Sequence, residues 1–106
     1  MQSKELLRGA LRIIVLRLLS ERKQMYGYEI TQLVKELTAN EIELTFGALY
    51  PTLHKLEAEG LLTTKTVVID NRARKYYSLT RNGSETAPAE VRSYFDFVKA
   101  MNLVLK

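Results

Sequence analysis

The chain has 106 residues, no cysteine and a formal net charge of +4, from 16 Lys and Arg against 12 Asp and Glu. This length suits one domain, and the lack of cysteine excludes disulfides and thiolate chemistry. With 46% hydrophobic and 26% charged residues, the composition excludes disordered and collagen-like chains, and no apolar run is long enough to span a membrane. Residues 1–9 show no signal-peptide pattern. We therefore expect a cytoplasmic protein with no membrane contact, and its basic balance weakly favours a polyanionic partner.

The first predicted helix covers residues 4–20. Polar positions such as Arg8 and Arg12 form a narrow stripe on it, and most of the remaining circumference is apolar. A helix that is apolar nearly all round is buried on more than one side. Because the chain is small, we expect part of this surface to contact a second subunit.

A polar connection leads to a second helix, expected over residues 26–38, whose apolar side chains recur at helical spacing. The third helix is expected over residues 46–59, with Thr45 as its N-cap and Gly60 just past its end. These two short helices and the loop between them are typical of a helix-turn-helix.

Pro51 lies inside the leucine pattern of the third helix. A proline in a helix interior costs roughly 3 kcal/mol, because it has no N–H to donate and its ring collides with the carbonyl four residues earlier. That carbonyl belongs to Gly47, whose backbone has the widest latitude. We expect the helix to start before Pro51 and to bend on the face opposite its leucines.

Two β-rich segments follow, residues 61–69 and 75–79, joined by residues 70–74. Thr, Val, Ile and Tyr suit a half-buried sheet, and the Asp-Asn pair at the start of the connection favours a turn, so we predict a hairpin. Its tip is expected to carry three basic side chains: Arg72, Arg74 and Lys75.

The C-terminal residues end in a helix on which apolar side chains cover about half the circumference. Pro88 either kinks this helix or lies in its first turn. The predicted fold is mainly α with a small β-hairpin (α+β), in the order of a winged helix-turn-helix with an added C-terminal helix. We expect residues 1–80 to form the DNA-binding domain and residues 81–106 a dimerisation helix of the same compact unit.

Opposite its leucines, the third helix presents small and polar residues: Gly47, Ala48, Pro51, Thr52, His54 and Lys55. Small residues let the backbone approach DNA closely, while His54 and Lys55 can reach phosphates or base edges. The alternative is an ordinary solvated helix face. The three basic residues of the hairpin suit a phosphate backbone, although charges also keep a turn soluble. Together the helix and the hairpin favour DNA contact.

Catalytic and metal chemistry find little support in the sequence. His54 is the only histidine and cysteine is absent, so a metal site would depend on carboxylates alone. Neither a Ser/His/Asp triad nor a phosphate-binding glycine loop is recognisable. We expect no enzyme, no metal and no cofactor.

Three segments resemble those of the PadR family of transcriptional regulators, specifically its members with a short C-terminal helix. The family's entry into its second helix is similar to "GYEI" at residues 27–30, and its recognition helix resembles "GALYPTLHKLEAEGLL" at residues 47–62. Its wing strand and the start of its last helix resemble "RARKYYSLTRNG" at residues 72–83. The likeness covers residues 6–83.

The resemblance implies a homodimeric repressor, joined through its first and last helices, that responds to a small aromatic or lipophilic effector. We expect it to bind double-stranded DNA at a palindromic operator with half-sites roughly 10 base pairs apart. The alternative is a winged-helix adaptor that binds acidic protein surfaces and not DNA.

The residues expected to contact DNA lie on the second helix, the third helix and the hairpin: Tyr28, Thr45, Gly47, Tyr50, Pro51, His54, Lys55, Arg72, Arg74 and Lys75. The candidates for effector binding lie on the first and last helices: Ile14, Leu18, Val91, Tyr94, Phe95 and Val98. Tyr94 is equally consistent with an ordinary tyrosine in a dimer core.

Overall fold

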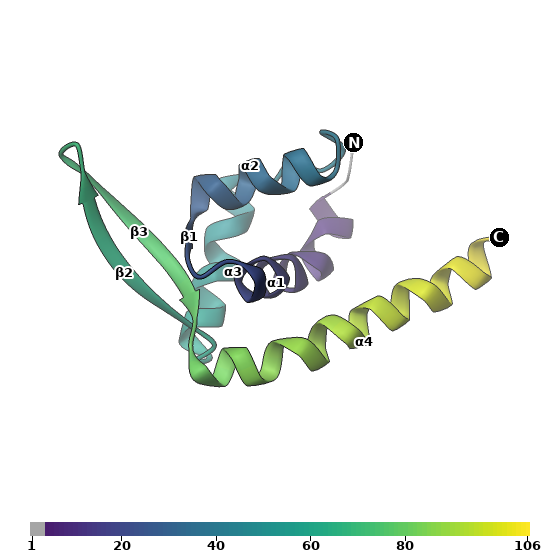
Figure 1. The fold of residues 1–106 in the computed structure, drawn as a ribbon. Helices are drawn as coiled ribbons and strands as arrows, with labels where there is room; N and C mark the ends of the chain where they lie inside the picture. Colours follow the sequence, from purple (N-terminus) through teal and green to yellow (C-terminus); the bar gives the residue numbers. More distant parts are fainter. Residues whose placement is uncertain (1–3) are drawn as a thin grey trace.

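The computed structural model describes residues 4–106, and side chains from residue 6 onward. Residues 1–3, which belong to the stretch without a signal-peptide pattern, lie outside the described residues. Four helices and three strands occupy the described part of the chain (Figure 1). Their bounds are α1 Lys4–Glu21, β1 Met25–Tyr26, α2 Gly27–Leu37, α3 Phe46–Ala58, β2 Leu62–Ile69, β3 Arg72–Leu79 and α4 Arg81–Leu105. The predicted α+β winged helix-turn-helix with an added C-terminal helix is confirmed.

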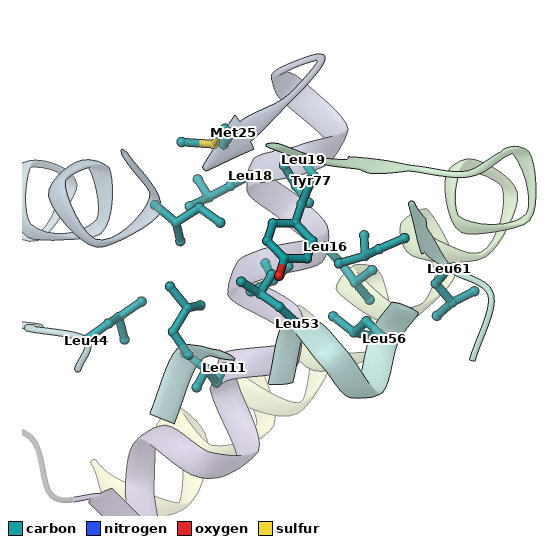
Figure 2. Packing of buried hydrophobic residues seen from close by; sticks show 14 of the residues in the cluster. Leu11, Leu16, Leu18, Leu19, Met25, Leu44, Leu53, Leu56, Leu61 and Tyr77 are labelled. Carbon is teal, nitrogen blue, oxygen red and sulfur yellow. The ribbon is translucent and has the colours of Figure 1, made fainter. Parts of the chain in front are cut away.

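The hydrophobic core lies where α1, α3 and the sheet meet. The leucine stripe of α3 is fully buried, through Leu49, Leu53 and Leu56. Figure 2 shows the ring of Tyr77, from β3, in the middle of the leucines that α1 and α3 contribute. Burial raises the pKa of the Tyr77 hydroxyl, which has no hydrogen-bond partner among the described residues. The core therefore fixes the inner face of α3 and leaves its opposite face outside.

The start of α3 agrees with the sequence prediction. The helix begins at Phe46, so Pro51 lies inside it. Thr45 is the N-cap, and its side-chain oxygen accepts a hydrogen bond from the backbone N–H of Ala48 at 3.2 Å. Gly47 and Pro51 are both exposed, so they lie on the face where the sequence predicts a bend.

The end of α3 is closed by a Schellman motif. Gly60 has a positive φ of 80°, which glycine adopts without steric cost. The N–H of Leu61 donates to the carbonyl of Leu56 at 3.0 Å, and the N–H of Gly60 donates to the carbonyl of Glu57 at 3.0 Å. Both ends of α3 are thus set by residues next to it in the sequence.

The predicted bounds of the hairpin's second strand are wrong. β3 begins at Arg72 rather than at residue 75. Asp70 and Asn71 both have positive φ, 51° and 63°, and turn the chain in two residues, as in a type I′ turn. Arg72 and Arg74 therefore lie in a paired strand and not in a loop.

The segment predicted as a polar connection before α2 contains a short strand. In β1, Met25 pairs with Tyr77 and Tyr26 pairs with Tyr76, so the sheet order is β1-β3-β2. Two residues are too few to show an alternating pattern in the sequence. Tyr26 has an extended backbone, and its N–H donates to the carboxylate of Glu29 at 3.0 Å, so α2 begins one residue later than predicted.

α4 is one helix of 25 residues, which rules out a late start at Pro88. It begins earlier because the Thr80 side chain accepts a hydrogen bond from the N–H of Gly83 at 3.0 Å. After Tyr94 every residue is exposed, and Figure 1 shows this half of α4 projecting away from the body. None of the helices in residues 4–106 is sufficiently long and apolar to cross a membrane.

Candidate nucleic-acid interface

The outer face of α3 is open, as predicted. Five of its six expected residues are exposed and Thr52 is half-buried; the five are Gly47, Ala48, Pro51, His54 and Lys55. The first three have small side chains near the helix start, where Thr45 is also exposed. This face can come close to a groove wall, and it has polar groups towards its end.

An aromatic row runs along one edge of α3. The ring centroids of Phe46 and Tyr50 lie 5.7 Å apart, and those of Tyr50 and His54 lie 6.1 Å apart. Tyr50 is half-buried, and a Cβ added to Gly27 would overlap its hydroxyl. Tyr50 therefore packs α3 against the start of α2 and keeps only part of its surface for a partner.

His54 lies at the end of this row and is exposed. Among the described side chains, residues 6–106, no group of three His, Cys, Asp or Glu could hold a metal ion. An exposed imidazole can donate and accept hydrogen bonds at the surface of α3.

A second aromatic group joins α2 to the sheet. Tyr28, exposed at the start of α2, stacks on Tyr26 with ring centroids 6.5 Å apart. Arg74 lies over the Tyr26 ring, with its guanidinium carbon 4.8 Å from the centroid, and donates to the Tyr26 hydroxyl at 3.1 Å. This contact holds Arg74 against the start of α2. Sequence reasoning did not single out Tyr26, because its role depends on strand pairing.

The three basic residues expected at the hairpin tip do not share one face. Arg72 and Arg74 are two residues apart in β3 and therefore lie on the same face of the sheet. Lys75 lies on the other face, with its ammonium nitrogen 5.6 Å from the centroid of the Tyr77 ring. Lys65 pairs with Tyr76 and lies on the face of Arg74. Sequence reasoning missed Lys65, because only the strand register brings it there.

The hairpin is strongly cationic. Residues 62–79 contain four basic side chains, Lys65, Arg72, Arg74 and Lys75, and one acidic side chain, Asp70. Among the ion pairs formed by the side chains of residues 6–106, none involves these four cations. Their charges are therefore available to a polyanion.

A separate groove of about 750 Å³ lies between α1, α2 and α4. All six candidate effector residues line it: Ile14, Leu18, Val91, Tyr94, Phe95 and Val98. Arg17 and Arg92 also line the groove, and each forms an ion pair within its own helix. The groove is therefore a mainly apolar hollow with aromatic side chains and two charged ones.

Comparisons with known proteins agree with this architecture. The model of the Transcriptional regulator PadR-like family matches residues 15–89. Transcriptional regulator Rv3488 of Mycobacterium tuberculosis is 39% identical over 80 residues, which cover 76% of this chain and 71% of that protein. A transcriptional regulator from Clostridium thermocellum has a similar structure, with a TM-score of 0.85, 25% identity, and coverage of 97% of this chain and 100% of that one. For a PadR family transcription regulator from Clostridium difficile R20291, the TM-score is 0.75 at 30% identity, with coverage of 92% and 100%.

Proposed function

This chain belongs to the PadR-like family of transcriptional regulators, and from that premise we propose that it is a homodimeric repressor of transcription. Family members are DNA-binding regulators and not enzymes. In this proposal residues 1–80 bind a palindromic operator and residues 81–106 join two copies in the cytoplasm. A small aromatic or lipophilic effector releases the operator.

The proposal depends on one observation, the combination in one domain of an open recognition helix and a hairpin whose basic side chains form no ion pair within residues 6–106. The outer face of α3 presents small residues at its start and Lys55 near its end. The hairpin adds Lys65, Arg72 and Arg74 on one face. A helix in the major groove, with basic side chains along the adjacent phosphates, is the docking geometry of helix-turn-helix proteins.

Dimerisation is supported by the exposed apolar surface of α4. Phe95, Val98 and Met101 lie on one side of its projecting half and are all exposed. A contiguous apolar surface of this kind is typical of an interaction site. A second copy of the same helix covers it in this proposal.

Effector release is supported by the groove between α1, α2 and α4. Its volume of about 750 Å³ suits a small molecule. Tyr94 and Phe95 give it aromatic rings, and both residues belong to the helix that we assign to the dimer. A ligand there can therefore change how the two copies meet.

The proposed function is tested by a gel-shift assay on the promoter of the protein's own operon. We expect a saturable shift that resists non-specific competitor DNA. The alternative, a winged-helix adaptor for acidic protein surfaces, predicts no such shift, so its absence would contradict the proposed repressor.

The role of the hairpin is tested by a salt titration of binding. Replacing Arg72 and Arg74 with Ala should lower the slope of log affinity against log salt by about 0.9 for each phosphate that the variant no longer neutralises. Lys106→Ala, at the far end of α4, removes one charge as a control and should leave the slope unchanged. An unaltered slope in the double variant would contradict the hairpin's role at phosphates.

A further inference from the structure

Arg12, in the middle of α1, links α3 and α4. Its Nε donates to Oε1 of Glu90 at 2.8 Å, and its Nη2 donates to Oε2 of Glu90 at 3.0 Å. Its Nη1 donates to Oε2 of Glu59 at 2.9 Å. Glu59 is the C-cap of α3 and Glu90 lies in α4. The planar guanidinium binds Glu90 through two parallel hydrogen bonds, which fix the orientation of the carboxylate as well as its distance from Arg12.

Both carboxylates depend on Arg12. Hydrogen bonds from its guanidinium hold the pKa of Glu59 and the pKa of Glu90 below their usual value, so both are ionised at neutral pH. The charge of Glu59 by itself raises the pKa of Glu90, because the two acids repel each other. About a third of each of the three side chains is exposed. One cation therefore holds two acids together at a partly shielded crossing of three helices.

Glu90 lies where α4 leaves the body of the protein. Before it, Gly83 and Ala87 are buried. After it, Val91 is half-buried and all residues beyond Tyr94 are exposed. Among the side chains of residues 6–106, the other ion pair of α4 joins Arg92 to Asp96 in the same helix. The bond to Arg12 is thus the ion pair that ties α4 to the body before the helix projects.

We infer that Arg12, Glu59 and Glu90 form a strut that fixes the angle between α3 and α4, and thereby the separation of the two recognition helices in the dimer. The inference rests on the proposed function for its effect on DNA. Residues 90–105 extend about 22 Å along the helix, so a 10° change at Glu90 moves the far end by about 4 Å. The rise per base pair is about 3.4 Å. A small change of angle is therefore enough to put two recognition helices out of register with a palindrome.

The angle is tested first without DNA and without reference to the dimer. The chain contains no cysteine, so Ala48→Cys and Ser93→Cys, both exposed, place one spin label on α3 and one on α4. Mixing the labelled protein with an excess of unlabelled protein restricts electron–electron resonance to distances within one chain. We expect one narrow distance distribution, which Glu90→Gln broadens or shifts.

Glu85→Gln is the matched control, because Glu85 is an exposed acid on the same helix. It should leave the distribution narrow. Glu59→Gln, which keeps the bidentate bond to Glu90, should broaden the distribution less than Glu90→Gln does. If Glu90→Gln and Glu85→Gln give the same distribution as the unsubstituted chain, there is no strut.

DNA binding gives a second readout. The direction in which Glu90→Gln changes the affinity for DNA distinguishes the strut from a simple effect of charge. Glu90→Gln removes a negative charge, so electrostatics alone would strengthen binding to DNA. The strut predicts about tenfold weaker binding to the palindrome, unchanged binding to a single half-site, and less discrimination against a palindrome with one extra base pair. Glu85→Gln should behave as the unsubstituted protein.

The two readouts distinguish failure of the strut from failure of the proposed function. Unchanged selectivity for half-site spacing in Glu90→Gln would overturn the strut's role in DNA binding. If the protein does not bind DNA but the label distance still responds to Glu90→Gln, the proposed function is wrong and the strut itself stands.

Discussion

Replacing a helical glycine with alanine should have opposite effects on stability at Gly83 and at Gly9. A Cβ at Gly83 would overlap the backbone carbonyl oxygen of Leu61, whereas a Cβ at Gly9 would meet no atom within 4 Å. We expect Gly83→Ala to lower the free energy of unfolding by about 2 kcal/mol, because backbone must move to admit the methyl group. Gly9→Ala should raise it by about 0.5 kcal/mol, because alanine loses less conformational entropy in a helix. Urea denaturation of the two variants measures both, and equal effects would refute the close contact at Gly83.

The ionised carboxylates around Arg12 make stability depend on pH. The pKa values of Glu59 and Glu90 in the folded protein lie below the usual 4.5, so the unfolded chain takes up protons first on acidification. The contribution of the strut to the free energy of unfolding is therefore complete above about pH 5 and is lost as the pH falls through the lowered pKa values.

This pH dependence can be measured by comparing the urea denaturation of the protein with that of its Glu90→Gln variant. At pH 7 the variant should be less stable by about 1 kcal/mol, the upper end for partly exposed ion pairs. At pH 3 the difference should be smaller, because the stability that the ionised Glu90 contributes is lost as the pH falls through its lowered pKa. A difference of the same size at both pH values would mean that the ionised pair does not carry it.

Among the elements, α3 combines a structural and a proposed functional role at its N-cap. The Thr45 hydroxyl oxygen accepts a hydrogen bond from the N–H of Ala48, and Thr45 is also exposed on the side that we assign to DNA. Thr45→Ala should lower the free energy of unfolding by about 1 kcal/mol through loss of the cap. Thr45→Asp keeps a capping oxygen and so should keep the stability, but its charge would face phosphates.

The two substitutions therefore separate the two roles. Thermal denaturation should show a loss for Thr45→Ala and none for Thr45→Asp, whereas operator binding should weaken more in Thr45→Asp. If Thr45→Asp binds DNA as tightly as the unsubstituted protein, Thr45 does not face a phosphate.

How well each element could be predicted depends on how local its determinants are. For α3, the leucine spacing, Thr45 and Gly60 all lie within or beside the helix, so its bounds follow from the sequence. The strand β1 depends on the pairing of Met25 with Tyr77, far away in the chain, and its two residues carry no pattern of their own. The start of β3 depends on left-handed backbone at Asp70 and Asn71, which the sequence permits without requiring it.

The candidate interface shows the same limit. The outer face of α3 follows from helical geometry, so its exposed residues could be predicted from the leucines alone. The contact between Arg74 and Tyr26, and the bonds from Arg12 to Glu59 and Glu90, join residues distant in sequence. Such contacts leave no periodic pattern in one chain, so sequence reasoning missed them.

At the scale of the whole molecule, the two halves of α4 differ in what holds them. The first half is fixed to the body through buried Gly83 and Ala87 and through Glu90. The second half projects with apolar side chains exposed, and this arrangement extends the molecule to 52 Å along its longest axis. In the proposed dimer, the packed end of α4 would set the angle at which the projecting end meets a second copy.

Val98→Glu tests directly whether two copies associate through the projecting half of α4. Val98 lies on the apolar side of the projecting half and lines the groove. A charge there would have to be buried in the proposed dimer without a partner, which is strongly unfavourable. We expect light scattering to show a monomer and operator affinity to fall, because one copy reads only one half-site. Ala100→Glu, two residues later on the opposite side of the helix, should remain a dimer. A dimer in both variants would show that the two copies meet elsewhere, and the separation of their recognition helices would then not depend on α4.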